Sequence, residues 1–431
     1  MRVLFVAFPW RTHFWFTVPM AWALRTAGHE VHVASSREFA VNVTEAGLTA
    51  VPVGSKEPIL QRAYREQKEA FGDGKGIVDP IDLGENREEL LPWSYLKALC
   101  SGAVARSRIV NDAMIDDLVA YCRWWKPDLV VWEWLTNAGA VAASAVGAAH
   151  ARMPIGLGLD VRLRRHFLKT MARQDPGERV DPVREWLGGW GEKYGFDFSE
   201  ELLTGQFTIE QWPDSMRLET GVPHLSTRYV PYNGRAPYSG RSLVPDWVHH
   251  EGKAPRVLAT FGTSMWDMTK PLLSSAQLQK MLDSVAGLDI ELVLTLPAGI
   301  QKELERVPRN TRLVEFVPLH AIISSCSAVI HHGGFPTFCS SLAHGLPQLM
   351  VSRSTPDAAL RGARLEEAQA GQWLPPHRTT GKEIGKYLAR MLEDPSLRSG
   401  AERLRQDVLA QPSPNQLVPE LERLAAEYRS A

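Results

Sequence analysis

The sequence has few cysteines, no excess of either charge and no long apolar run, and each shortage excludes a class of protein. Its four cysteines form no CxxC pair and have no histidine at zinc spacing, so we expect a reduced, cytoplasmic protein without a structural metal. Lysines and arginines number 48 against 49 aspartates and glutamates, a net charge of -1. We therefore expect no binding to nucleic acid or to an anionic membrane. No apolar run approaches the roughly 20 residues of a membrane-spanning helix.

What the sequence does contain is an alternation of strand and helix patterns, over a chain of 431 residues that is long enough for two domains. In the first half, the stretch 55–105 has weak periodicity and mixed charge, and we interpret it as an insertion of loops and short helices. The remaining patterns predict strands over 2–8, 29–34, 50–53 and 129–132 and helices over 18–27, 106–125 and 138–149. Such an alternation predicts a parallel sheet with helices on both faces.

Proline, glycine and tyrosine interrupt this alternation over residues 223–252, which we interpret as an interdomain linker. A second alternation follows, with strands predicted over 256–262, 290–296, 313–317, 328–331 and 348–351. The last stretch, 413–431, has apolar residues at helical spacing and is expected to pack back toward the first domain. The predicted fold class is thus α/β, with two Rossmann-like, doubly wound domains over 1–222 and 253–412.

One loop after a predicted strand has the composition of a phosphate site. The strand 328–331 continues into His332, Gly333 and Gly334, and a predicted helix follows. Two glycines allow the backbone to approach a ligand closely, and the helix N-terminus offers free amides to a phosphate. His332 adds a donor and Thr337 a hydroxyl. The alternative is a tight turn with two packing histidines.

The loop after the first strand contains His13, whose imidazole is suited to accept a proton near neutral pH. Glu133 lies at the end of the predicted strand 129–132. The alternatives are a surface histidine and a glutamate that caps the next helix. By contrast, the Gly-Leu-Gly segment 156–158 lacks the third glycine and the following helix of a dinucleotide fingerprint, and we interpret it as a turn.

Fourteen tryptophans are unusual, and many of them occur early in the chain. Core packing accounts for most of them. The alternative is a pocket for a large apolar ligand, to which aromatic rings offer broad contact. The candidates for such a pocket are Trp10, Trp15 and Trp134.

The loop at 330–337 resembles the donor-diphosphate signature of GT-B glycosyltransferases that use nucleotide sugars. The segments 317–320 and 345–348 and the residue Asp357 resemble the family's nucleobase-lining segment, the turn after the loop and a sugar-contacting acid. Bacterial antibiotic glycosyltransferases that move TDP-deoxyaminosugars onto macrolide- and anthracycline-type polyketides have segments similar to 18–23, 27–31, 47–54, 126–130 and 232–234. The resemblance covers nearly the whole chain.

This resemblance implies a GT-B fold whose first domain holds the acceptor and whose second holds a TDP-sugar, facing each other across a cleft. It implies inverting transfer of a deoxysugar to a hydrophobic aglycone, with His13 as general base and Glu133 as its partner. Donor binding is assigned to Gly262, Thr263, Ser264, Val317, His332, Gly333, Gly334, Phe335, Thr337 and Asp357, and acceptor binding to Trp10, Trp15 and Trp134. No Asp-x-Asp pair accompanies the loop, so we expect no metal and no cofactor beside the donor substrate.

The sequence departs from the family pattern in three places: in the donor loop, after Asp357, and at Trp10 and Arg11, where relatives have smaller residues. Pro336 stands where the family loop usually has glycine, which removes one backbone donor, and Ala358 stands where many relatives that use ordinary hexoses have glutamine. The alternatives are a nucleotide-sugar epimerase of the same fold and a non-catalytic binding or activating subunit. The resemblance also implies an auxiliary activator protein, which the insertion 55–105 would contact, against the alternative that this insertion is an acceptor lid. A homodimer is open as well.

Overall fold

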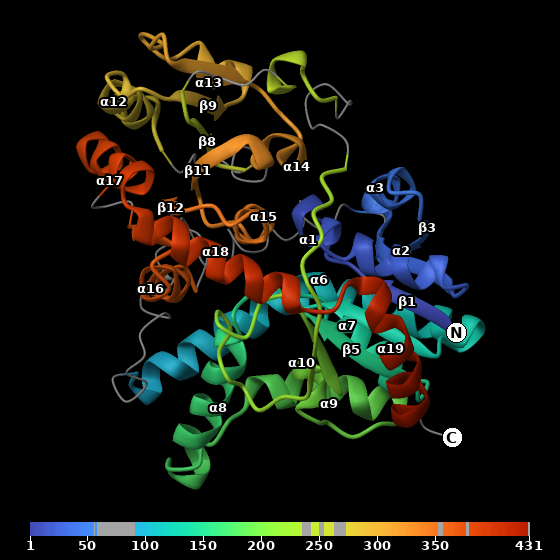
Figure 1. Cartoon of the computed structure of the whole chain (residues 1–431). Coiled ribbons are helices and arrows are strands. Elements are labelled where there is room, and N and C mark those ends of the chain that lie inside the picture. The colour runs from blue at the N-terminus through green and yellow to red at the C-terminus, as the bar shows by residue number, and fades with distance from the viewer. Residues whose placement is uncertain are drawn as a thin grey trace.

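The computed structural model describes residues 1–55, 57, 91–234, 243–249, 254–262, 273–351, 357–375 and 379–429. Within these ranges the chain forms two α/β domains, each built around a parallel sheet (Figure 1). The predicted donor residues Thr263 and Ser264 and most of the predicted insertion 55–105 lie outside the described residues.

The first domain contains a seven-stranded sheet in the order β3-β2-β1-β4-β5-β6-β7. Its strands are β1 (Arg2–Val6), β2 (Glu30–Ser36), β3 (Thr49–Val53), β4 (Leu129–Glu133), β5 (Ala149–Met153), β6 (Phe207–Glu210) and β7 (His224–Ser226). All neighbouring strands pair in parallel. Every residue of β4 and β5 is buried, as expected for strands that helices cover on both faces.

The second domain contains a six-stranded sheet in the order β10-β9-β8-β11-β12-β13, again parallel throughout. Its strands are β8 (Arg256–Thr260), β9 (Glu291–Thr295), β10 (Thr311–Val314), β11 (Cys326–His331), β12 (Gln348–Val351) and β13 (Gly371–Leu374). In both sheets the strand order reverses beside the first strand, between β1 and β4 and between β8 and β11. These are the points at which doubly wound sheets bind ligands. The predicted fold class is confirmed.

Helices cover both faces of each sheet (Figure 1). Those of the first domain are α1 (Arg11–Trp15), α2 (Val18–Thr26), α3 (Ala40–Glu45), α6 (Trp93–Trp125), α7 (Ala138–Ser144), α8 (Leu159–Met171), α9 (Pro182–Tyr194) and α10 (Glu201–Thr204). The second half contains α12 (Ser275–Val285), α13 (Ala298–Gln301), α14 (Leu319–Ile322), α15 (Phe335–Ala343), α16 (Ala358–Glu367), α17 (Gly381–Glu393), α18 (Pro395–Ala410) and α19 (Pro414–Tyr428).

The alternation of side chains along β1 explains why both faces need cover. Val3 and Phe5 are fully buried with residues of α2 and α19 on one face. Leu4 and Val6 are fully buried with residues of α6 and α7 on the other face. Because successive side chains of a strand point to opposite faces, a strand of continuous apolar residues is stable only between two layers of helices.

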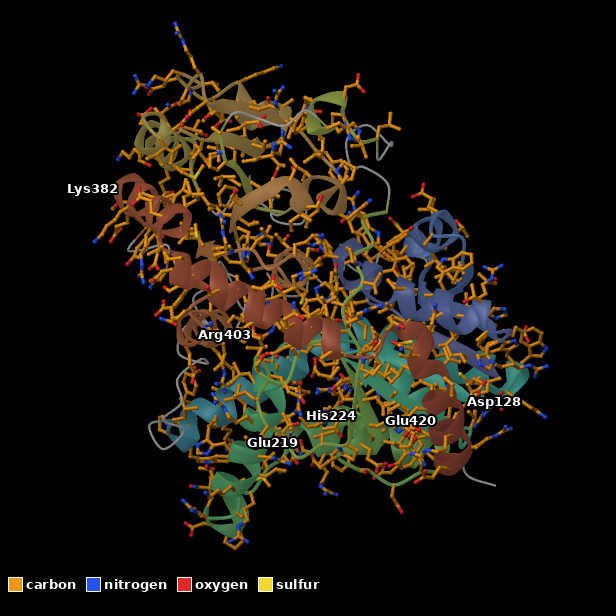
Figure 2. The ribbon with its side chains drawn as sticks, viewed as in Figure 1. Asp128, Glu219, His224, Lys382, Arg403 and Glu420 are labelled. Carbon is orange, nitrogen blue, oxygen red and sulfur yellow. The ribbon has the colours of Figure 1, made fainter. Side chains whose placement is uncertain are left out.

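The last helix of the chain returns to the first domain. After α18 the chain crosses from the second domain, and α19 packs against α2 and β5 (Figure 1). Asp128, beside the end of this helix (Figure 2), pairs with Arg429. His29 contributes a second polar link, because its Nε2 lies 2.9 Å from a carboxylate oxygen of Glu422.

A cluster of aromatic side chains joins the two domains. The ring of Phe335, at the start of α15, lies 5.6 Å from that of Phe16, 5.3 Å from Trp212 and 5.5 Å from Tyr229, each in an edge-on orientation. Pairs of this geometry contribute about 0.5–1.5 kcal/mol each beyond the burial of their surface. Phe16 directly follows α1, so the cluster holds the beginning of α15 against the end of α1.

Two predicted helix boundaries were wrong. Helix α6 begins at Trp93, inside the stretch interpreted as loops and short helices, because Leu96 and Val104 are buried and give this segment an inner face. Ser101 and Gly102 between them hid that periodicity in the sequence. The small-residue helix predicted over 138–149 ends at Ser144, and Ala149 instead begins β5.

Several elements were not predicted, among them β6, β7 and β13. Strand β7 pairs with β6, so the segment interpreted as a linker from residue 223 first adds a strand to the first sheet. The Gly-Leu-Gly segment 156–158 is followed by α8, contrary to the prediction that no helix follows it. Gly158 has a φ of 90°, which permits the sharp entry into that helix.

Candidate active site

His13 and Glu133 meet where the strand order of the first sheet reverses. His13 lies in the short helix α1, rather than in an open loop, and Glu133 is the last residue of β4. The Nδ1 atom of His13 is 2.9 Å from Oε1 of Glu133, which is fully buried, while the imidazole is 20% exposed. Since a carboxylate only accepts, Nδ1 carries the proton and the lone pair of Nε2 remains for another group.

Two further residues hold the Glu133 side chain in place. Its second oxygen, Oε2, accepts a hydrogen bond of 2.9 Å from the backbone N–H of Leu135. Asn111, fully buried on α6, donates to the Leu135 carbonyl at 2.9 Å and accepts from the N–H of Ala138 at 2.8 Å. Both oxygens of the buried carboxylate are thus paired, which offsets the cost of removing its charge from water.

His331 shapes the loop between β11 and α15. Its Nδ1 accepts a hydrogen bond of 3.0 Å from the N–H of Gly333, and its Nε2 lies 2.8 Å from Oε1 of Gln348. Burial lowers the pKa of His331 to about 3, so the ring is neutral with its proton on Nε2. Gly333 then turns with a φ of 83°, a conformation that other residues rarely adopt.

The imidazole of His332 fits between two glycines. A Cβ atom on Gly262 would lie 2.5 Å from Cε1 of this ring, and one on Gly334 would lie 2.4 Å from Nε2. Burial lowers the pKa of His332 to about 4, so it offers a neutral hydrogen bond rather than a positive charge near pH 7. Its Nδ1 is buried and has no hydrogen-bond partner within the described residues. A buried polar atom without a partner is typical of a site in which a ligand supplies the missing hydrogen bond.

The first turn of α15 adds backbone donors beside His332. Phe338 donates the first intrahelical hydrogen bond, to the carbonyl of Gly334, so the preceding amides are not used within the helix. Pro336 lies within this turn and has no N–H. The side chain of Phe335 is buried in the interdomain cluster, so only its backbone can face a ligand. Thr337 is buried in the same turn.

Asp357 and Val317, two more predicted donor residues, are both buried. Oδ2 of Asp357 accepts from the N–H of Leu157 at 3.0 Å and lies 3.0 Å from Nη2 of Arg361, so this carboxylate joins the domains. Val317 packs with residues that include Ile322 and Leu346 near the start of α14. The sugar and nucleobase contacts of both residues remain predictions.

The three predicted acceptor tryptophans have different surroundings. Trp134 directly follows Glu133, and its buried Nε1 has no hydrogen-bond partner in the described part of the chain. Trp10 precedes α1, and its carbonyl accepts from the N–H of His13 at 3.0 Å. Trp15 faces the interdomain segment instead: a Cβ on Gly234 would lie 2.7 Å from its ring, which also lies edge-on to Tyr232 at 6.5 Å. The acceptor contacts of all three tryptophans remain predictions.

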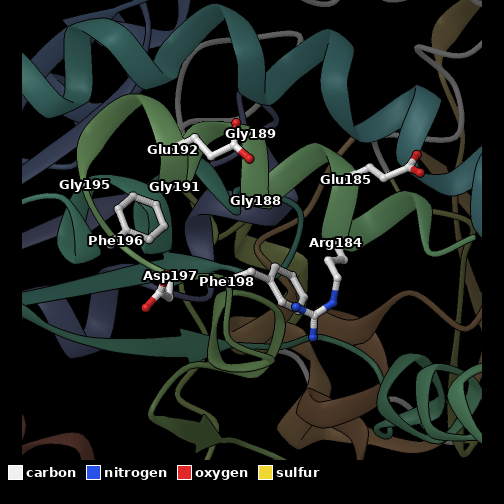
Figure 3. Close-up of a pocket in the computed structure, with 10 residues that line it drawn as sticks. All are labelled: Arg184, Glu185, Gly188, Gly189, Gly191, Glu192, Gly195, Phe196, Asp197 and Phe198. Atoms are coloured by element: carbon white, nitrogen blue, oxygen red, sulfur yellow. The ribbon is translucent and has the colours of Figure 1, made fainter.

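A surface hollow of about 690 Å³ lies elsewhere, on α9 and the turn after it (Figure 3). None of its lining residues was a predicted site residue. Among the side chains that the structure describes, no three histidines, cysteines, aspartates or glutamates gather as metal ligands. No described helix is both long and apolar enough to span a membrane.

Two Rossmann-like domains with residues gathered at both strand-order reversals have the architecture of GT-B glycosyltransferases, and comparisons with known proteins identify the family. Models of the erythromycin biosynthesis protein CIII-like N-terminal and C-terminal domains match residues 22–262 and 279–424. The chain therefore belongs to the erythromycin biosynthesis protein CIII-like family of antibiotic glycosyltransferases.

Individual relatives match over their full length. The 10-deoxymethynolide desosaminyltransferase of Streptomyces venezuelae is 42% identical, covering 100% of this chain and 98% of that protein. The TDP-daunosamine transferase DnrS of Streptomyces peucetius is 40% identical over 100% of this chain and 98% of its own. The crystal structure of the glycosyltransferase VinC in complex with DTDP has a TM-score of 0.86 and 35% identity, and the match covers 99% of this chain and 100% of that one.

Sequence reasoning missed three residues that shape the site: Asn111, His331 and Arg361. His331 ends a buried strand and precedes a glycine pair, which is the position of a turn-forming side chain. Arg361 stands four residues after Asp357, a spacing that pairs opposite charges on one helix face. Asn111 left no signal, because a single asparagine in a long helix is usually solvated.

Proposed function

We propose that the protein is an inverting glycosyltransferase that moves a deoxysugar from a TDP-sugar to a hydrophobic natural-product aglycone, with His13 as general base. The observation that carries the proposal is the pair formed by Glu133 and His13, of which His13 lies on α1, the helix whose end contacts the start of α15. A proton acceptor is thereby close to a loop suited to a diphosphate. The names of the relatives, which include a desosaminyltransferase and a TDP-daunosamine transferase, support the donor and acceptor classes.

The reaction is a single displacement. Nε2 of His13 takes the proton of the acceptor hydroxyl while the oxygen forms a bond to the anomeric carbon. The bond from that carbon to the diphosphate oxygen breaks on the opposite face, and the diphosphate leaves with the electron pair. Glu133 holds the tautomer that makes Nε2 the acceptor and stabilises the imidazolium as it forms. The anomeric configuration is therefore inverted.

The leaving diphosphate gains negative charge in the transition state. The amides of Gly334, Phe335 and Thr337 offer hydrogen bonds at the positive end of α15, and the neutral ring of His332 offers one in the tautomer that has its proton on Nδ1. Donors that are already oriented stabilise this charge without a reorganisation cost. No step requires a metal ion, so we expect the reaction to proceed in the presence of a chelator.

On the acceptor side, Trp134 directly follows Glu133 and combines an apolar indole ring with an N–H that can donate a hydrogen bond. An aglycone with an apolar body and a few oxygens matches such a surface. A nucleotide-sugar epimerase would need no acceptor, and the relatives named above are transferases. That alternative is therefore not favoured.

A transfer assay tests the proposal. The purified chain is incubated with a TDP-deoxysugar, with and without a macrolide or anthracycline aglycone, and the products are analysed by mass spectrometry. We expect thymidine diphosphate and a glycosylated aglycone only when both substrates are present. Conversion of the TDP-sugar to an isomer without an aglycone would instead indicate an epimerase. An auxiliary protein is tested by repeating the assay with the candidate partner added.

Replacing Glu133 by glutamine is expected to lower kcat by about 10- to 100-fold, the range known for loss of the group that orients a metal-bound imidazole. The carboxylate accepts from both His13 and Leu135, whereas an amide has one oxygen for these two donors. Steady-state kinetics with saturating donor measure the effect. The matched control is Glu393→Gln, at an exposed residue of α17, which should keep the wild-type kcat. Equal rates for both variants would contradict the role of Glu133.

Replacing His332 by alanine is expected to weaken thymidine diphosphate binding by about tenfold. The reason is that the variant loses one hydrogen bond to a charged group, and about 1.4 kcal/mol corresponds to a factor of ten in affinity. Isothermal titration with thymidine diphosphate measures this directly. The KM for the aglycone should stay unchanged, since His332 belongs to the second domain. Wild-type nucleotide affinity in this variant would show that the loop is only a turn.

A further inference from the structure

We propose that Arg361 is a positioning residue that aims the donor-binding loop and ties its geometry to the contact between the two domains. The proposal deepens the proposed function and rests on the assignment of the loop at Gly333 and Gly334 to the donor diphosphate. Arg361 lies on α16, is 2% exposed, and was not among the predicted site residues.

The guanidinium of Arg361 contacts both domains at once. Its Nη1 donates to the carbonyl of Gly333 in the donor-binding loop at 2.7 Å. Its Nη2 donates to the carbonyl of Ile155, in the first domain, at 2.9 Å. The central carbon of the group, Cζ, lies over the ring of Trp212, also in the first domain, at 5.0 Å from the ring centre. A planar group with several fixed donors can make these contacts together, whereas a single ammonium cannot.

Asp357 completes this interdomain clamp, which consists of Arg361, Asp357 and the first-domain segment 155–157. Oδ2 of Asp357 pairs with Arg361 at 3.0 Å and accepts from the N–H of Leu157 at 3.0 Å. The backbone of the segment 155–157 is therefore held at two points, one carbonyl and one amide. The opposite charges of the pair offset each other, which makes the burial of the arginine tolerable.

The contact with Gly333 has a direct consequence for ligand binding. The carbonyl of Gly333 and the N–H of Gly334 belong to one planar trans peptide, in which the two groups point in opposite directions. Arg361 holds that carbonyl from the side of α16, so the N–H of Gly334 points away from α16. This N–H is one of the donors assigned to the diphosphate. A glycine at position 333 can rotate freely unless such a bond fixes it.

Because the same guanidinium also holds Ile155, the orientation of the donor-binding loop depends on the domain contact. When the domains are together, the loop is fixed before the donor arrives, and less conformational freedom is lost on binding. If the clamp is broken, Gly333 and Gly334 must be ordered by the nucleotide itself. The expected cost is seen in nucleotide affinity and in the KM for the donor, not in the KM for the acceptor.

The test compares Arg361→Lys and Arg361→Met with Arg364→Met, a matched control one turn further along α16 that pairs with Glu367 on the surface. Thymidine diphosphate affinity is measured by isothermal titration, and both KM values by steady-state kinetics. We expect about tenfold weaker nucleotide binding for both Arg361 variants, corresponding to loss of one charged hydrogen bond. The control should bind as the wild type does.

Arg361→Lys keeps a positive charge beside Asp357 and is expected to fold with a Tm close to that of the wild type. Wild-type nucleotide affinity in both Arg361 variants would overturn the proposal. Failure of Arg361→Lys to fold would overturn it too, because the residue would then support the fold rather than the loop. If the wild-type protein itself does not bind thymidine diphosphate, the proposed function fails instead, so the two failures are distinguishable.

Discussion

Replacement of His13 by alanine is expected to lower the kcat of glycosyl transfer by about 100- to 10,000-fold, the usual contribution of a general base. An acceptor hydroxyl is a weak nucleophile until its proton leaves, and Nε2 of His13 is the proposed proton acceptor, which the bond from Nδ1 to Glu133 leaves free. The donor-binding loop lies in the other domain and stays intact. Thymidine diphosphate should therefore bind to the variant as it does to the wild type.

The matched control for this experiment is His249→Ala, which removes an exposed histidine of the segment before the second domain. It should turn over at the wild-type rate. Nucleotide affinity by isothermal titration shows that the His13→Ala protein is folded at the donor site. A His13→Ala turnover within a few-fold of the wild type would exclude this residue as the base.

Replacement of Gly334 by alanine is expected to weaken nucleotide binding by about 100-fold, because two hydrogen bonds to the charged ligand are lost. The new Cβ would lie 2.4 Å from Nε2 of His332, closer than any stable contact, so the imidazole must leave its place. The displaced ring and the shifted loop backbone then no longer offer their donors together. The change adds one methyl group and removes no functional group.

Gly299→Ala is the matched control, because a Cβ at this residue of α13 meets no atom within 4 Å. In a helix, alanine is also favoured over glycine by about 1 kcal/mol, so this variant should be as stable as the wild type or more so. It should bind thymidine diphosphate normally. Gly334→Ala protein with unchanged nucleotide affinity would show that the His332 ring is not part of the donor site.

The sequence predicted the main positions of the site because they follow from local patterns. A run of apolar residues marks β1 and β4, and side chains that follow such strands meet where the strand order reverses. The family resemblance named His13 and Glu133 as partners, and their positions after β1 and at the end of β4 agree with that pairing. The glycine pair after β11 likewise predicted the loop in which Gly333 has a positive φ.

The contacts between the domains could not be predicted in this way. The pairing of Phe16 with Phe335, and of Arg361 with Ile155, depends on how two separately folded sheets pack together. No periodicity within one domain encodes that orientation. Asp357 illustrates the limit: the family resemblance implies a sugar contact, but no pattern in the sequence indicated that its carboxylate also contacts Arg361 and Leu157 between the domains.

The start of α6 was hidden for a local reason. Its first turns contain serine and glycine at positions that break the apolar repeat, and the burial of Leu96 depends on neighbouring elements such as α8. Tertiary packing therefore stabilises a helix that its own sequence only weakly favours.

The most direct test of the central claim, a single displacement assisted by the pair of His13 and Glu133, is the anomeric configuration of the product. A TDP-deoxysugar of known configuration is transferred to the aglycone, and proton NMR coupling constants of the isolated glycoside define the new bond. The account predicts inversion, with the glycosidic bond on the face opposite to the departed diphosphate. A product that retains the configuration of the donor would contradict it, because direct attack by a hydroxyl deprotonated at His13 cannot give retention.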